Sequence, residues 1–106
     1  MTDKRIVLTT AGSEEEAHTI ARHLVESRLA ACVNIIPQIE SIYRWQGKVE
    51  SSREWLLLAK TTQERFPAVR DAIRKLHSYD LPECVVIKIE DGSSDYLQWL
   101  TDSVQE

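Results

Sequence analysis

A small set of side chains in this sequence could bind a ligand or take part in a reaction. The set holds a thiol, an imidazole, two phenols, an ammonium group and two carboxylates, on Cys32, Tyr43, Lys60, His77, Tyr79, Asp80 and Glu83. Thiolate, imidazole and carboxylate together are donors suited to copper or zinc. Cys32 and His77 lie far apart in sequence, so only folding could bring them together.

The segment from His77 to Glu83 places a histidine, a tyrosine and two carboxylates within seven residues. Each has an ordinary explanation by itself, because a histidine favours a helix C-terminus and a strand cysteine usually packs as a small hydrophobe. Their combination makes this segment a candidate site. We predict that Cys32, His77, Asp80 and Glu83 bind Cu²⁺ or another divalent cation, Cu²⁺ more tightly than Zn²⁺, and we predict no organic cofactor.

Catalysis is the alternative use of the same residues. Cys32 as nucleophile and His77 as base form the minimum pair for a thiol enzyme. No third group that would orient them is evident, and the sequence lacks the glycine-rich nucleotide loops, the GxSxG elbow and the HExxH zinc motif. We therefore predict a binding protein rather than an enzyme. A structural trimer that only scaffolds other proteins is the third reading.

Length and charge narrow the class of protein. The chain has 106 residues, which fits one domain over 1–106. Its net charge of −4 argues against nucleic acid and anionic membranes as partners. The apolar run at 6–8 is too short for a signal sequence or a membrane span, so we expect a cytoplasmic protein with its two cysteines unpaired.

Hydrophobic periodicity predicts four strands and three helices. The expected strands cover 5–10, 31–45 with an interruption at Pro37, 49–60 and 84–90. Two helices should begin at capping boxes, formed by Ser13 with Glu16 and by Thr61 with Glu64, and a short helix should follow residue 94. The order βαββαβα predicts an α+β, ferredoxin-like sandwich with an extra C-terminal helix and a long hairpin between the second and third strands.

Three blocks of the sequence resemble the signatures of one family. The first is 24–35, the second is 41–50, and the third joins the 77–83 segment to 95–99. Together they resemble the CutA family, which is associated with tolerance of divalent metals, copper especially. The resemblance implies a tight homotrimer, similar in architecture to the PII signalling proteins, in which long hairpins pair with neighbouring subunits. The aromatic hairpin agrees with this, because unpaired strand edges need a partner.

The resemblance also implies a ligand cleft where subunits meet. Its matching positions here are Cys32, Tyr43, Trp45, Lys60, His77, Tyr79, Pro82 and Glu83. We accordingly expect Tyr43, Trp45, Lys60, Tyr79 and Pro82 to bind a small ligand. The chain departs from the family at Ser78, where proline is usual, at Asp80, where glutamate is usual, and at Gln38, where glycine is common.

Overall fold

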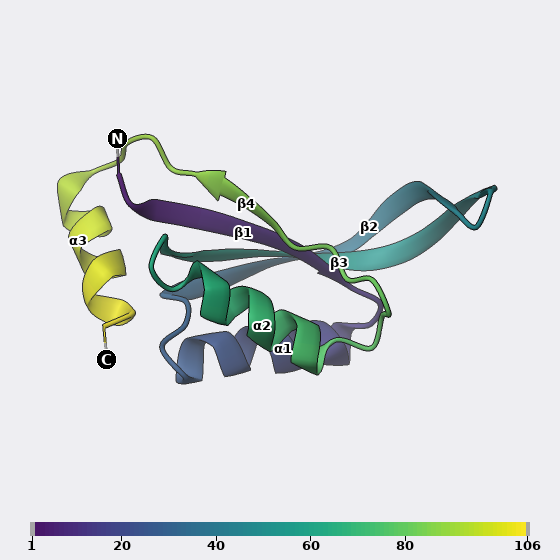
Figure 1. Ribbon diagram of the computed structural model, residues 1–106, viewed down its shortest axis with the longest axis horizontal. Coiled ribbons are helices and arrows are strands. Elements are labelled where there is room, and N and C mark those ends of the chain that lie inside the picture. The colour runs from purple at the N-terminus through teal and green to yellow at the C-terminus, as the bar shows by residue number, and fades with distance from the viewer. Residues whose placement is uncertain (1, 106) are drawn as a thin grey trace.

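Residues 2–105, described by a computed structural model, form one four-stranded antiparallel sheet with two helices packed on one face (Figure 1). The strands are β1 (Lys4–Ala11), β2 (Cys32–Trp45), β3 (Lys48–Thr62) and β4 (Val85–Lys88), in the order β2-β3-β1-β4. The helices are α1 (Glu14–Glu26), α2 (Phe66–Leu76) and α3 (Ser94–Ser103). This arrangement confirms the predicted ferredoxin-like α+β fold with its additional helix. The predicted domain over 1–106 extends one residue beyond the described residues at each end.

One of the two predicted helix caps is present. The Ser13 hydroxyl accepts a hydrogen bond of 3.1 Å from the Glu16 N–H and so caps α1. The second prediction was wrong, because β3 continues to Thr62, opposite Lys4, and α2 begins only at Phe66. Pairing in the sheet thus takes Thr61, the residue that would have capped the helix.

The hairpin of β2 and β3 contains one irregularity and one tight turn. Ile36 pairs with Leu56 but Ile39 pairs with Glu54, so two residues of β2 oppose one residue of β3. This confirms the predicted interruption, and Gln38 there has a φ of 56°. At the far end the turn residues Gln46 and Gly47 have φ values of 51° and 82°, as a tight hairpin turn requires.

The helices and the sheet enclose the main hydrophobic core. Side chains alternate along a strand, so every second residue of β1 and β3 faces α1 and α2. The fully buried members of this core are Val7, Ala11, Ala17, Ile20, Leu24, Leu57, Ala59, Val69 and Ile73. Neither α1 nor α2 covers the opposite face of the sheet, and α3 lies at one end of the sheet, where its Tyr96 approaches Cys32 (Figure 1).

That second face, which we call the open face, is also apolar. It carries Ile6, Leu8, Leu56 and Leu58, which alternate with core residues along β1 and β3. Ile36, Val85 and Ile87 extend it on the outer strands and are 45–50% exposed. Within residues 2–105 no helix combines the length and the apolar character that crossing a membrane requires.

Candidate functional site

His77 caps the end of strand β1. β4 pairs with β1 only as far as Leu8, so the carbonyl of Thr10 lies beyond the last rung of that ladder. His77 Nε2 donates to this carbonyl at 2.5 Å, and its Nδ1 accepts from the Tyr79 N–H at 3.1 Å. A carbonyl only accepts and a backbone N–H only donates, so the ring proton sits on Nε2. The side chain is 0% exposed, and both of its nitrogens are engaged within the chain.

Glu16 fastens the loop that follows His77. Its carboxylate accepts hydrogen bonds from the Ser78 N–H at 2.8 Å and from the Gly12 N–H at 3.4 Å. Burial acts to raise the pKa of Glu16, but these hydrogen bonds outweigh burial and leave the pKa lowered. The Ser78 N–H therefore has a structural role, which the proline that the resemblance led us to expect at this position could not fill.

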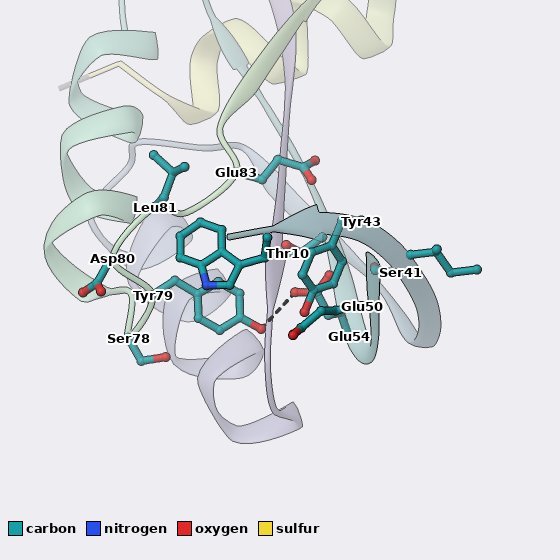
Figure 2. A pocket seen from close by; sticks show the side chains of 12 residues that line it. Thr10, Ser41, Tyr43, Glu50, Glu54, Ser78, Tyr79, Asp80, Leu81 and Glu83 are labelled. Carbon is teal, nitrogen blue, oxygen red and sulfur yellow. Dashed lines mark hydrogen bonds between the residues drawn. The ribbon is translucent and has the colours of Figure 1, made fainter. Parts of the chain in front are cut away.

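Tyr79 reaches from this loop to the base of the hairpin. Its hydroxyl donates to Glu54 Oε2 at 2.9 Å, as the dashed line in Figure 2 shows. The ring crosses Gly12 so closely that a Cβ at this position would lie 2.8 Å from the Tyr79 hydroxyl oxygen. Burial, and then the hydrogen bond to Glu54, raise the pKa of Tyr79 far above its usual range. Tyr79 is therefore a neutral hydrogen-bond donor at all physiological pH values.

A groove of about 790 Å³ lies between the hairpin and the loop that joins α2 to β4 (Figure 2). Three aromatic rings and four carboxylates line it. The lining residues are Thr10, Ser41, Ile42, Tyr43, Trp45, Glu50, Glu54, Ser78, Tyr79, Asp80, Leu81 and Glu83. Five of the nine predicted site residues thus share one groove, while Pro82 belongs to the loop that forms its wall.

Cys32 and Lys60 lie toward the other end of the sheet. They pair with each other, and Lys60 pairs in turn with Ile6, four residues before Thr10 in β1. Four residues of strand correspond to roughly 13 Å, so Cys32 and His77 do not meet within one chain. The Lys60 ammonium donates to Asn34 Oδ1 at 2.8 Å, and Cys32 Sγ lies 3.8 Å from the Tyr96 hydroxyl of α3.

The predicted site residues therefore form two separate groups, one in the groove and one around Cys32. In the described residues, no three His, Cys, Asp or Glu side chains lie close enough together to hold a metal ion. The register of the sheet keeps Cys32 and His77 apart within one subunit. A single chain therefore cannot use both residues together, either to bind a metal or as a thiol-catalytic pair. A site that combines two subunits stays a prediction.

Sequence reasoning missed three residues of this region, namely Glu54, Glu50 and Gly12. Glu54 is the last polar residue before the apolar run of β3, and it faces the groove because it alternates with core residues. A single glutamate directly before an apolar strand run was thus the sequence signal that could have identified Glu54. At Gly12 the sequence indicates only the end of a strand, whereas the structure shows that this glycine makes room for Tyr79.

Fold and site together define a ferredoxin-like α+β protein whose projecting hairpin forms one wall of an acidic, aromatic groove. The family model described as CutA1 divalent ion tolerance protein matches residues 5–103, almost the whole chain. The chain therefore belongs to the CutA family, and the resemblance seen in the sequence is confirmed.

Individual relatives agree with this assignment. The chain is similar to the divalent-cation tolerance protein CutA of Thermus thermophilus, with 51% identity over 94% of this chain and 97% of that protein. It is 46% identical to Protein CutA of Homo sapiens, over 92% of this chain but only 56% of the human protein. A solved structure of the Thermus thermophilus protein, Cut A1, covers 96% of this chain and is 99% covered by it, with a TM-score of 0.94 and 50% identity.

Proposed function

We propose that this protein is a homotrimeric, non-catalytic binding protein that takes a small ligand or a divalent metal ion where its subunits meet, and that it contributes to tolerance of divalent metals. The observation that carries the proposal is the division of the expected site residues into two groups within one chain. Cys32 and Lys60 could join the groove residues only if a second copy supplied them.

The open face supports assembly. A sheet with one bare apolar face exposes surface that a soluble protein normally covers. Ile36, Val85 and Ile87 are exposed there, and Ile42 and Val49 near the hairpin tip are 70% and 65% exposed. A closed ring of identical chains would cover this face and pair the projecting hairpins with neighbours. Light scattering at micromolar concentration should give three times the mass of one chain, and a monomer mass would reject the trimer.

The role in metal tolerance rests on the names of the family and of its relatives. Copper is the metal we propose, with Asp80 and Glu83 from the groove of one subunit and Cys32 from another. For His77 to join them, the metal must displace either the Thr10 carbonyl or the Tyr79 N–H from the ring. This competition predicts weaker binding than at a histidine with a free nitrogen.

Calorimetric titration of the trimer with Cu²⁺ and Zn²⁺ tests the metal proposal. Affinity for Cu²⁺ should exceed affinity for Zn²⁺ and should fall in both His77→Ala and Cys32→Ser. If Cys32→Ser alone abolishes uptake, copper merely reacts with a thiol. If neither change matters, copper is not the ligand of this cleft.

The thiol-enzyme alternative is tested separately. Rapid stoichiometric alkylation of Cys32 at neutral pH would reveal a thiolate and favour an enzyme, whereas slow labelling agrees with the binding protein that we propose. Both cysteines are free in the structure, which fits the reducing cytoplasm as the proposed location. A trimer that binds neither a metal nor a small ligand would favour the third alternative, a structural trimer that scaffolds other proteins.

A further inference from the structure

The charge of the groove is one-sided. Its carboxylates belong to Glu50, Glu54, Asp80 and Glu83, and no lysine, arginine or histidine side chain belongs to its lining among residues 2–105. Acidic residues at a surface are usually solvated and need no partner. The position of Glu54 distinguishes this group from an ordinary acidic surface.

Glu54 lines the groove and is mostly buried there. It is only 7% exposed, and its carboxylate accepts one hydrogen bond, from the neutral Tyr79 hydroxyl to Oε2. Its Oε1 has no hydrogen-bond partner in the described part of the chain, and no ion pair there involves this carboxylate. Oε1 is not among the fully buried polar atoms, so it is open to the groove, and a mostly buried carboxylate without a counter-charge favours the arrival of a cation.

The walls of the groove show which kind of cation fits. Tyr43 and Trp45 from β2 and Tyr79 from the loop bring aromatic rings to the same cavity as Glu54. The faces of such rings attract ammonium and guanidinium groups, and aromatic cages recognise quaternary ammonium ions in this way. A metal ion instead needs several oxygen, nitrogen or sulfur donors around one point, and the described residues provide no such group of three.

We propose that the groove binds a small organic cation, with Glu54 as its counter-ion and Tyr43, Trp45 and Tyr79 around its positively charged group. This inference rests on the proposed binding function and names the chemical class of the ligand. The volume of about 790 Å³ lies within the range of sites for small molecules. Tyr79 fixes one oxygen of Glu54 and leaves the other for the cation.

A matched pair of probes tests the charge requirement. Choline carries a quaternary ammonium group, and 3,3-dimethylbutan-1-ol has the same shape with a neutral carbon in place of nitrogen. Titration calorimetry on the full chain should show choline binding at least about tenfold more tightly than the alcohol. Glu54→Gln keeps an acceptor for the Tyr79 hydroxyl but removes the charge, so it should remove this preference. Glu64→Gln, an exposed site outside the groove lining, should leave it intact.

The outcomes separate this inference from the proposed function. Equal binding of the two probes would overturn the organic cation and still leave a small-molecule cleft. Binding of Cu²⁺ but of neither probe would also overturn it and would favour the metal. If no probe binds to a confirmed trimer, the inference is again wrong. A monomer that binds nothing would reject both proposals.

Discussion

Leu57 and Leu58 are neighbours on β3, yet their side chains meet different surroundings. Leu57 is 0% exposed beneath α1 and α2, whereas Leu58 points to the open face, which neither of these helices covers. The helix side of the sheet is complete within one chain. The open side and the hairpin carry apolar and aromatic groups that the chain leaves partly exposed, among them Ile36, Tyr43 and Trp45. The difference indicates that the helix side maintains the fold and that the other side is available for assembly and binding.

Trp45→Ala should produce the largest change. Trp45 is 42% exposed in the single chain, so its truncation would cost little if the hairpin stayed free. In an assembled, packed hairpin the loss should reach about 3–5 kcal/mol. The matched control is Arg22→Ala on the outer surface of α1, which should change stability by less than about 0.5 kcal/mol. Thermal unfolding of both variants is the measurement, and equal shifts would show that Trp45 is not packed in an interface.

The two leucines of β3 allow a direct test of the two faces. Leu57→Ala should lower the free energy of unfolding by about 2–5 kcal/mol at every protein concentration, because it opens a cavity in the core. Leu58→Ala should instead weaken assembly, so that its denaturation midpoint depends on protein concentration more steeply than that of the parent. Urea unfolding at two concentrations distinguishes these behaviours. An identical, concentration-independent loss in both variants would contradict the comparison.

Glu16→Gln should have a smaller effect, which depends on pH. The hydrogen bonds from Ser78 and Gly12 lower the pKa of Glu16 in the folded state, so its stabilising contribution is present above the pKa of the unfolded chain. That contribution is lost as the pH falls through the folded pKa, in the acid range below the ordinary glutamate value of about 4.3. Glu16→Gln should cost about 1–2 kcal/mol at pH 7 and flatten this acid decline.

Ser78→Pro is a companion variant, because it removes the N–H but leaves the Glu16 carboxylate in place. Unfolding curves from pH 3 to pH 7 provide the measurement for both variants. Parallel declines in the parent and in Glu16→Gln would show that the contact does not stabilise the fold.

The smallest expected change is a gain. Gln38 has a φ of 56°, a left-handed conformation that costs a residue with a Cβ about 1 kcal/mol or more and that glycine adopts freely. Gln38→Gly should therefore stabilise the protein by at most about 1 kcal/mol. The matched control is Gln38→Ala, which removes the same polar group but keeps the Cβ and its strain. Thermal unfolding compares the two variants, and an equal gain in both would contradict the argument.

The sequence was sufficient for the fold but only for part of the site. Ser13 with Glu16 predicted a true cap because both residues follow a strand that has already ended. Thr61 with Glu64 has the same pattern, but the β1–β3 ladder extends to Thr62. Local sequence does not reveal this, because the pairing depends on tertiary contacts with a distant strand. The acids of the 77–83 loop were found because they are close in sequence. Glu54 was missed because its burial depends on Tyr79, which is distant along the chain and joins it only after folding.

The irregularity in β2 decides where this strand can change its length. Two residues there oppose one residue of β3, so deletion of Gln38 would restore regular pairing and leave Tyr43 on the same face as Glu54. Deletion of Ser41, in the regular ladder beyond, would instead turn Tyr43 and Trp45 to the other surface. The groove can therefore tolerate the loss of one residue at the irregularity in β2. The loss of one residue a few positions further along would remove both aromatic side chains of β2 from the groove.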